Sequence, residues 1–255
     1  MSLFYILVKL IVYFTTSPDK SVSVVSGLIS GSDKLQVTQN PQSSDSAVVS
    51  RSNNAQSGME FTWSVWLYIS SAETADISGV YNHVFHKGGS KCEANGIATV
   101  NNAPGLYVSS RNGVASLNVF MDTVSTAATK PVLVVDNIPL KKWFHVAIRM
   151  QNNTLDIYLN GTISGRYQFT DVPKQNYDDV FVSGVDNNRG FSGQLSNLYY
   201  YSNALGVFEI NNIIMAGPSL TQSSKANKQA SLGFYSYMSN MWYNSNQGRS
   251  QPAGM

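Results

Sequence analysis

The stretch WFHVAIRMQNNTLDIYLNGTISGRYQF, Trp143 to Phe169, contains three consecutive strand patterns. In the first pattern every second residue is large and apolar, which is typical of a strand with one buried face: Phe144, Val146, Ile148 and Met150. The pairs Asn152-Asn153 and Asn160-Gly161 separate the three patterns. Since Asn and Gly tolerate positive φ, both pairs indicate tight hairpin turns. The stretch therefore predicts an antiparallel meander of three strands.

Strand patterns continue on both sides of this meander. Met59 to Ile69 alternates cleanly and places Trp66 and Tyr68 on the face opposite the apolar one, where they need cover from a loop or a partner. Further strands are expected at Val22 to Ile29, Ala47 to Val49, Val80 to Lys87, Gly105 to Ser110, Ala115 to Met121, Pro131 to Val135, Asp178 to Val182 and Gly190 to Tyr201. Leu205 to Ala216 has helical spacing and ends at Gly217-Pro218. About twelve strands with so little helix predict an all-β sandwich.

Three segments carry a family resemblance, in the order that the family requires. They are Phe61 to Ser70 (FTWSVWLYIS), the meander itself, and Gly190 to Leu205 (GFSGQLSNLYYYSNAL). Together they resemble the laminin-G-like, concanavalin-A-like jelly roll. This resemblance implies a jelly roll over residues 17–217, with core motifs in 59–205, in which an N-terminal strand pairs with one near the end and a short helix follows the last strand.

Composition narrows the class of protein. Charged residues are 13% of the 255 residues, about half the ~25% of typical soluble domains. The formal net charge is +2 without a dense Lys/Arg cluster, which argues against a nucleic-acid binder. Cys92 is the only cysteine, so the chain forms no internal disulfide, and synthesis in a reducing cytosol fits this count.

Residues 1–16 contain an apolar run from Leu3 to Phe14, interrupted by Lys9. Twelve helical residues span about 18 Å, which is short for a hydrocarbon core of ~30 Å. Three interpretations stay open: insertion in a membrane, docking on another protein, and a cleaved signal peptide. The expected anchor residues are Leu3, Phe4, Leu7, Leu10, Ile11 and Phe14.

Residues 218–255 differ from the rest of the chain because they are polar and contain no Asp or Glu. Within them lies the cluster FYSYMSNMWY, and aromatic residues and Met are enriched at the cores of interfaces. We expect an extended arm that orders on a partner, with a flexible tail as the alternative. The expected contact residues are Phe234, Tyr235, Tyr237, Met238, Met241, Trp242 and Tyr243.

Motifs for catalysis are missing from the sequence. Glycosidases of this fold need two carboxylates flanking the bond, and no Glu-x-Asp-x-x-Glu run is present, so we expect no enzyme. His83 and His86 should point to opposite sides of a strand, which disfavours a joint metal site. No cofactor is expected, although a calcium site built on the loop Asp186, Asn187, Asn188 and Arg189 with Asp122 or Asp136 stays open.

Two functions fit these features. A short apolar N-terminus, a jelly roll without disulfides and an aromatic tail resemble the minor capsid proteins of large icosahedral algal DNA viruses. That resemblance implies a structural protein of the virion, made in the host cytoplasm and placed on the inner side of the capsid near a membrane, with other capsid proteins as partners. The alternative is a surface-displayed carbohydrate-binding or adhesion module, with weak glycan binding at the rim Asp186 to Arg189, helped by Trp66 or Tyr68.

Overall fold

The computed structural model describes residues 21–43, 46–50, 52, 58–71, 79–111, 113–128, 130–188 and 190–223. The predicted N-terminal anchor lies outside these residues. So do the aromatic cluster of the arm and Arg189. The predicted jelly roll is therefore described over most of its length, together with the first residues of the arm.

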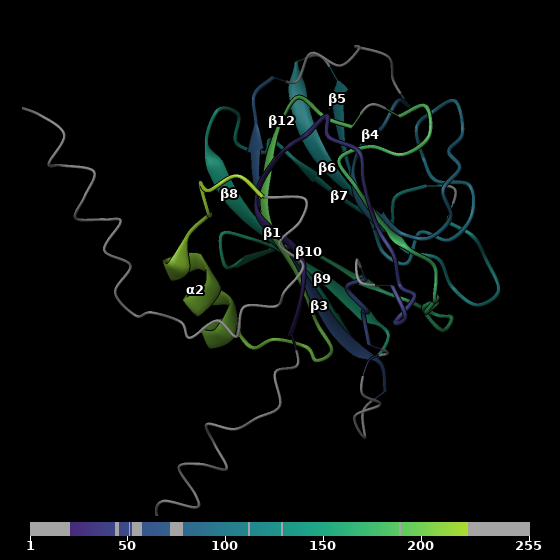
Figure 1. Cartoon of the computed structure of the whole chain (residues 1–255). Helices are drawn as coiled ribbons and strands as arrows, with labels where there is room; N and C mark the ends of the chain where they lie inside the picture. Colours follow the sequence, from purple (N-terminus) through teal and green to yellow (C-terminus); the bar gives the residue numbers. More distant parts are fainter. Residues whose placement is uncertain are drawn as a thin grey trace, which may run out of the picture.

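Two six-stranded antiparallel sheets form the described part of the molecule (Figure 1). The first sheet has the order β1-β12-β3-β8-β9-β10. Its strands are β1 (Ser21–Ser30), β12 (Gly193–Tyr201), β3 (Glu60–Ile69), β8 (Trp143–Gln151), β9 (Thr154–Leu159) and β10 (Thr162–Gln168). The predicted meander supplies β8, β9 and β10, and β1 pairs with β12 as the family resemblance implies.

The second sheet has the order β2-β11-β4-β5-β6-β7. Its strands are β2 (Leu35–Val37), β11 (Val180–Val182), β4 (Asn82–Lys87), β5 (Gly105–Arg111), β6 (Val114–Phe120) and β7 (Leu133–Asp136). Sequence patterns missed β2, which is only three residues long, and Ala47 to Val49 forms no strand. The jelly-roll prediction is otherwise confirmed in fold class, and the expected pairing of an N-terminal strand with a late one is that of β1 with β12.

A continuous apolar core fills the space between the sheets. Its largest fully buried side chains include Trp63 from β3, Phe85 from β4 and Phe144 from β8. The ring centroids of Trp63 and Phe85 lie 5.2 Å apart, so these two side chains join the sheets across the core. Alternation in β3 and β8 thus serves the purpose that the sequence predicts: apolar residues face inward and polar ones outward.

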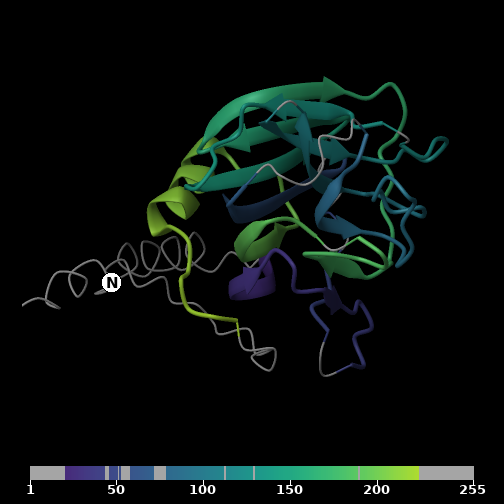
Figure 2. The same ribbon diagram turned by 90° about the horizontal axis from the view of Figure 1, so that it is seen from above.

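The helix α2 (Val207–Ala216) packs outside the sandwich on the first sheet (Figures 1 and 2). Ile210 is completely buried on the side of α2 that faces Ala147, Tyr158 and Tyr201. The hairpin turn at Gly161 also lies against α2. A Cβ on Gly161 would stand 2.7 Å from Asn211 Oδ1, and its φ of +82° is one that glycine adopts without strain.

After α2 the chain returns to the edge of the first sheet. Residues 217–223, here called the strap, form a parallel bridge between Gln222 and Leu28 of β1. The Leu28 amide donates to Thr221 O at 2.8 Å, and the Ser223 amide donates to Leu28 O at 2.9 Å. Ser196 of β12 adds a bond from its hydroxyl to Ser219 O, also at 2.8 Å. The beginning of the predicted arm is therefore attached to β1 and β12.

Candidate ligand-binding pocket and the surfaces around it

A pocket of about 90 Å³ opens at the end of the sandwich where β3 begins and β4 ends. Phe61, Trp63 and Tyr200 form its apolar side, and Tyr177, which is 81% exposed, lies at the surface. The remaining lining residues are Val49, Ser50, Ser52, Lys87, Ala103, Lys174, Gln175 and Asn176. Pockets for drug-sized ligands measure roughly 300–1,000 Å³, so this one has room for an end group and not for a whole ligand.

Lys87 is the most deeply buried charged residue of the pocket, with 6% of its surface exposed. Its amine donates to the backbone carbonyl of Asp178. Burial lowers the pKa of Lys87 to about 8, although the neighbouring carboxylates of Asp178 and Asp179 favour the charged form. The amine therefore carries a positive charge at neutral pH and loses it in mildly alkaline solution.

The amide side chains of the pocket differ in how much hydrogen bonding they have left. Asn176 donates to Lys87 O and accepts from the Asp178 amide, so its amide supports the loop. Gln175 donates to the Ser52 hydroxyl at 2.9 Å. The loop 174–177 is thus held by its own hydrogen bonds and by its contact with Ser52. Lys87 and Lys174 are the charged groups of the described lining.

The outer face of the second sheet is covered by the chain itself. Tyr107 is fully buried, and its hydroxyl donates to Asn102 Oδ1 at 2.6 Å and accepts from the Ala98 amide at 3.2 Å. Ile97 and Phe120 pack beside it. The loop between β4 and β5 is therefore bound to this face of the sheet. It covers Tyr107 and Phe120, which are not available to a ligand.

The same face corrects the sequence-based prediction for His83 and His86. The pairing of β4 with β5 shifts between His83 and Phe85, so Val84 and Phe85 both enter the core. This bulge brings both histidines to one side, with His83 Nε2 2.7 Å from His86 Nδ1. The prediction of opposite sides was wrong because it assumed an unbroken strand.

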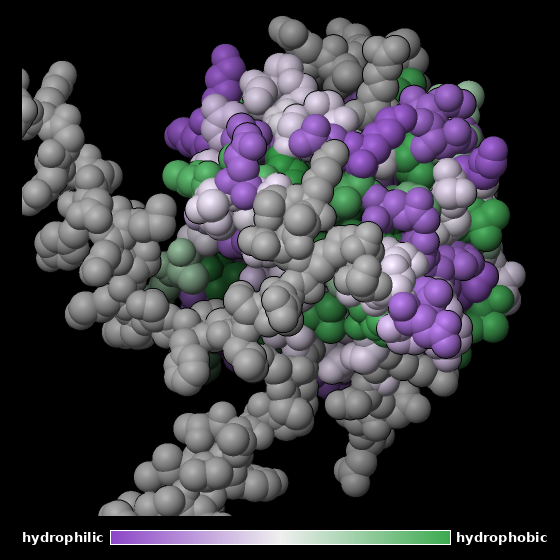
Figure 3. Space-filling view, in the orientation of Figure 1, coloured by the Kyte–Doolittle hydropathy of each residue, from purple (hydrophilic) through white to green (hydrophobic). Residues whose placement is uncertain are grey.

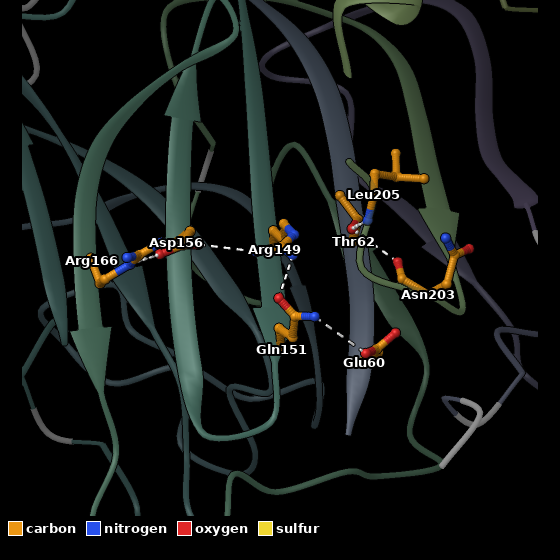
Figure 4. Close-up of polar contacts among 8 residues, drawn as sticks. All are labelled: Glu60, Thr62, Arg149, Gln151, Asp156, Arg166, Asn203 and Leu205. Carbon is orange, nitrogen blue, oxygen red and sulfur yellow. Dashed lines mark hydrogen bonds and ion pairs between the residues drawn. The ribbon is translucent and has the colours of Figure 1, made fainter. Parts of the chain in front are cut away.

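A polar row crosses the outer face of the first sheet beside α2 (Figure 4). Asp156 of β9 is buried and accepts from Arg149 of β8 at 3.2 Å and from Arg166 of β10 at 2.6 Å. The Arg149 guanidinium also donates to Gln151, and Gln151 Nε2 lies 3.5 Å from Glu60 Oε1. Each charge has a partner of opposite sign or an amide nearby, so the row ties four strands together.

Ser64 and His145 form a second buried pair on this face, with Ser64 Oγ 2.8 Å from His145 Nε2. A serine beside a histidine is the beginning of a nucleophilic site, but both side chains are at most 1% exposed and His145 Nδ1 has no partner among the described residues to orient the ring. Trp66 packs on the His145 ring at 5.3 Å and is itself 7% exposed. This pair is part of the packing, and Trp66 is not available as the ligand contact that the sequence suggested.

The predicted rim at Asp186 to Arg189 lies at the other end of β4 from the pocket. Asn188 accepts from the His83 and Gly190 amides and donates to Tyr81 O and Gly96 O, so its amide is fully used within the fold. Asp186 and Asn187 are exposed, and Asp186 O accepts from the Lys34 amine. The structure does not bring the described rim residues together with the pocket.

The proposed calcium partners are also separated. Asp122 accepts from the Asn102 and Ala128 amides, and Asp136 accepts from the Ser116 hydroxyl at 2.7 Å. No three His, Cys, Asp or Glu side chains converge within the part of the chain that the structure describes. The same part contains no helix with the length and apolar character needed to span a membrane.

The family model described as the concanavalin A-like lectin/glucanases superfamily, of laminin-G type, matches residues 41–211. This match covers well over half of the chain, so the chain belongs to that family. Its fold is that of a lectin-like binding domain, a class that is often carbohydrate-binding or adhesive. The pocket was not predicted from the sequence, because its residues come from six separate segments without a common motif.

Solved structures to which the chain is similar include toxin domains. The receptor-binding domain of botulinum neurotoxin mosaic serotype C/D is 17% identical with a TM-score of 0.48, over 77% of this chain and 45% of that chain. The binding domain of Paraclostridial Mosquitocidal Protein 1 is 16% identical with a TM-score of 0.44, over 75% and 46%. A sialidase of Trypanosoma rangeli is 13% identical with a TM-score of 0.43, over 62% and 23%. The chain thus spans less than half of each structure, and the likeness concerns the fold alone. No curated protein sequence matches the chain.

Proposed function

We propose that this chain is a non-enzymatic structural protein that joins neighbouring subunits of a larger assembly, as a minor capsid or cement protein of a large viral particle does. The exposed face of α2 carries this proposal. Phe208 is 85% exposed and Met215 is 75% exposed, while Ile210 on the opposite side is completely buried. Residues seven apart lie on the same side of a helix, so Phe208 and Met215 form one apolar surface, here called the α2 face.

The composition of α2 favours a protein as the occupant of this face. Helices that lie on membranes carry Lys and Arg on their polar side, whereas Glu209 is the charged residue of α2 and caps the Gly206 amide at 2.6 Å. Phe and Met are enriched in the cores of protein interfaces. In the space-filling view hydrophobic side chains, in green, reach the surface where α2 lies (Figure 3). We therefore assign the α2 face to a neighbouring protein subunit.

Two buried carboxylates, Asp156 and Asp122, support a non-enzymatic role. Asp156 is paired with two arginines, and Asp122 accepts from two backbone amides, so both carboxylates are engaged within the fold. Asp156 belongs to β9 of the first sheet, whereas Asp122 follows β6 of the second sheet. A glycosidase needs two carboxylates that flank one bond.

The test is co-sedimentation of the full chain with assembled particles from its source, before and after lipid is extracted with detergent. We expect retention at fixed stoichiometry after extraction, and loss of retention in the double variant F208S/M215S. Val124→Ser is the matched control, because Val124 is 68% exposed on a loop away from α2. Retention of the double variant would exclude the α2 face as the contact, and release of the chain with the lipid would make it a membrane-anchored surface module.

A second function, glycan binding on a displayed surface, is favoured by one observation. The pocket places two lysines and two amides beside aromatic residues, a combination that suits the end of a saccharide. Its small volume restricts this function to a terminal group.

A further inference from the structure

The polar side chains that line the pocket can all donate hydrogen bonds. No Asp or Glu side chain of the described residues lines it, whereas Lys87 and Lys174 both do. The carboxylates of Asp178 and Asp179 lie close enough to Lys87 to favour its charged form, although both also accept hydrogen bonds, from Asn101, Gln36 and the Gln39 amide. Lys174 forms no ion pair with the residues that the structure describes, so an incoming group meets its positive charge directly.

Two further donors come from the apolar side of the pocket. Trp63 and Tyr200 are 2% and 4% exposed and both line the pocket, where the Trp63 indole N–H and the Tyr200 hydroxyl are the side-chain donors of the apolar side. Burial raises the pKa of the Tyr200 hydroxyl, so it stays protonated and able to donate. A ligand that accepts hydrogen bonds from these two donors gains stabilisation on this side of the pocket.

We infer that the pocket binds the carboxylate of an acidic sugar residue at the end of a glycan chain. A carboxylate accepts several hydrogen bonds and gains most from charged donors, which matches the two lysines, the indole and the phenol. The hydroxyls of Ser50 and Ser52 complement the hydroxyl groups of a sugar, since the Ser52 hydroxyl, which accepts from Gln175, can still donate. The volume of about 90 Å³ admits the carboxylate and the adjoining ring atoms and leaves the rest of the chain outside.

This inference is independent of the α2 face. The pocket opens between the sheets, whereas α2 lies on the outer face of the first sheet. A glycan can therefore occupy the pocket while α2 contacts a neighbouring subunit. Pocket variants should leave co-sedimentation with particles unchanged, and the F208S/M215S variant should leave glycan binding unchanged.

The test is a titration of the full chain with D-glucuronate, with D-glucose as the neutral counterpart of the same ring. The readout is the NMR shift of the Trp63 indole N–H, assigned among the four tryptophans by W63F. We expect saturable binding of glucuronate and at least tenfold weaker binding of glucose. Raising the pH from 7 to 9.5 should weaken binding about tenfold, because Lys87, with a pKa of about 8 between Asp178 and Asp179, loses its charge.

Three variants locate the site. Y200F keeps the ring and removes the hydroxyl, and should weaken glucuronate binding about threefold to tenfold. K174M should weaken it about tenfold, and it removes no hydrogen bond of the Lys174 amine to the described residues. K142M is the matched control, because Lys142 is exposed before β8 and does not line the pocket. The K142M variant should bind glucuronate as tightly as the parent protein does.

Several results would overturn the inference. Equal binding of glucose and glucuronate would show that charge is not recognised, and unchanged affinity in both Y200F and K174M would place any binding elsewhere. No shift of the Trp63 signal with either sugar would mean that the pocket takes neither. Tighter binding of N-acetyl-alanine than of glucuronate would show that the pocket recognises the carboxyl terminus of a protein and not an acidic sugar.

Discussion

His83 Nε2 lies 2.7 Å from His86 Nδ1, and this contact fixes the protonation of both rings. The Gly184 amide donates to His83 Nδ1 at 3.0 Å, so the proton of His83 is on Nε2 and points to His86. His86 Nδ1 accepts it, and His86 Nε2 donates to Gly89 O at 2.9 Å. With both rings neutral, every ring nitrogen of the pair therefore forms one hydrogen bond. A proton added to either ring would place an N–H group opposite another N–H group.

Stability should fall in mild acid because all three histidines of the chain are buried. Burial lowers the pKa of His83 well below its usual value, and it lowers the pKa of His86 and of His145 to about 4. Above pH ~6.5 the histidines are neutral in both the folded and the unfolded chain. As the pH falls below ~6.5 only the unfolded chain takes up protons, so the free energy of unfolding should decrease by up to about 4 kcal/mol per pH unit.

Urea denaturation at pH 7.5, 6 and 5 measures this slope. His145→Gln should reduce this slope by about one third, because the unfolded chain then takes up two protons on its histidines instead of three. A free energy of unfolding that stays constant between pH 7.5 and 5 would contradict the buried, neutral state of the histidines.

Asp156→Asn should destabilise the sandwich by about 2–4 kcal/mol, since it leaves Arg149 with 16% of its side chain exposed and no charged partner. Arg166→Ala is the matched control, because the Arg166 side chain is 58% exposed and its loss leaves Asp156 paired with Arg149. Its effect should be clearly smaller. Chemical denaturation of both variants gives the comparison, and an equal loss in the two would show that Arg149 does not depend on Asp156.

Gly190→Ala should be much more damaging than Gly113→Ala. Both residues have positive φ, +83° and +75°, so both substitutions add backbone strain of about 1 kcal/mol. At Gly190 the new Cβ would also stand 2.0 Å from Gly31 O, whereas at Gly113 it would meet nothing within 4 Å. Thermal unfolding should show a shift of a few degrees for Gly113→Ala and a loss of folded protein for Gly190→Ala; similar shifts would mean that the β1–β12 edge moves apart at little cost.

Ile210→Ala should release α2 from the first sheet. The side chain is completely buried against Tyr158 and Tyr201, and truncation of a buried Ile costs about 2–5 kcal/mol. Hydrogen exchange of the α2 amides should rise sharply while exchange in the strands stays slow. Phe208→Ser, on the exposed side of the same helix, should leave exchange unchanged, and faster exchange in that variant would show that Phe208 packs within the fold.

Much of the fold follows from the sequence because its signals are local. Alternation in β3, β8 and β9 marks the apolar face that enters the core, although both faces of these strands are largely buried. Asn160-Gly161 marks a turn whose φ values of +47° and +82° exclude most other residues. Only the structure explains why residue 190 of the late motif is a glycine: its backbone lies against Gly31, and a Cβ would have no room there. Short strands carry too few residues for a period to show: β2 has three residues and owes its place to pairing with β11.

The site could not be read in the same way. Lys87, Trp63, Lys174 and Tyr200 lie far apart in sequence, and no pattern marks the end of a sandwich as a pocket. The histidine pair was misjudged for a related reason, because a bulge depends on the partner strand and leaves no mark in the period of its own strand. The rim Asp186 to Asn188 has the composition of a binding loop, yet the Asn188 amide holds the loop itself.

The strap has a mechanical consequence. Leu28 of β1 is bonded to both Thr221 and Ser223, and Ser196 of β12 is bonded to Ser219. Tension applied at Ser223 is therefore carried by two strands of the first sheet before it reaches α2, so the strap protects the packing of the helix from forces on this end of the described chain.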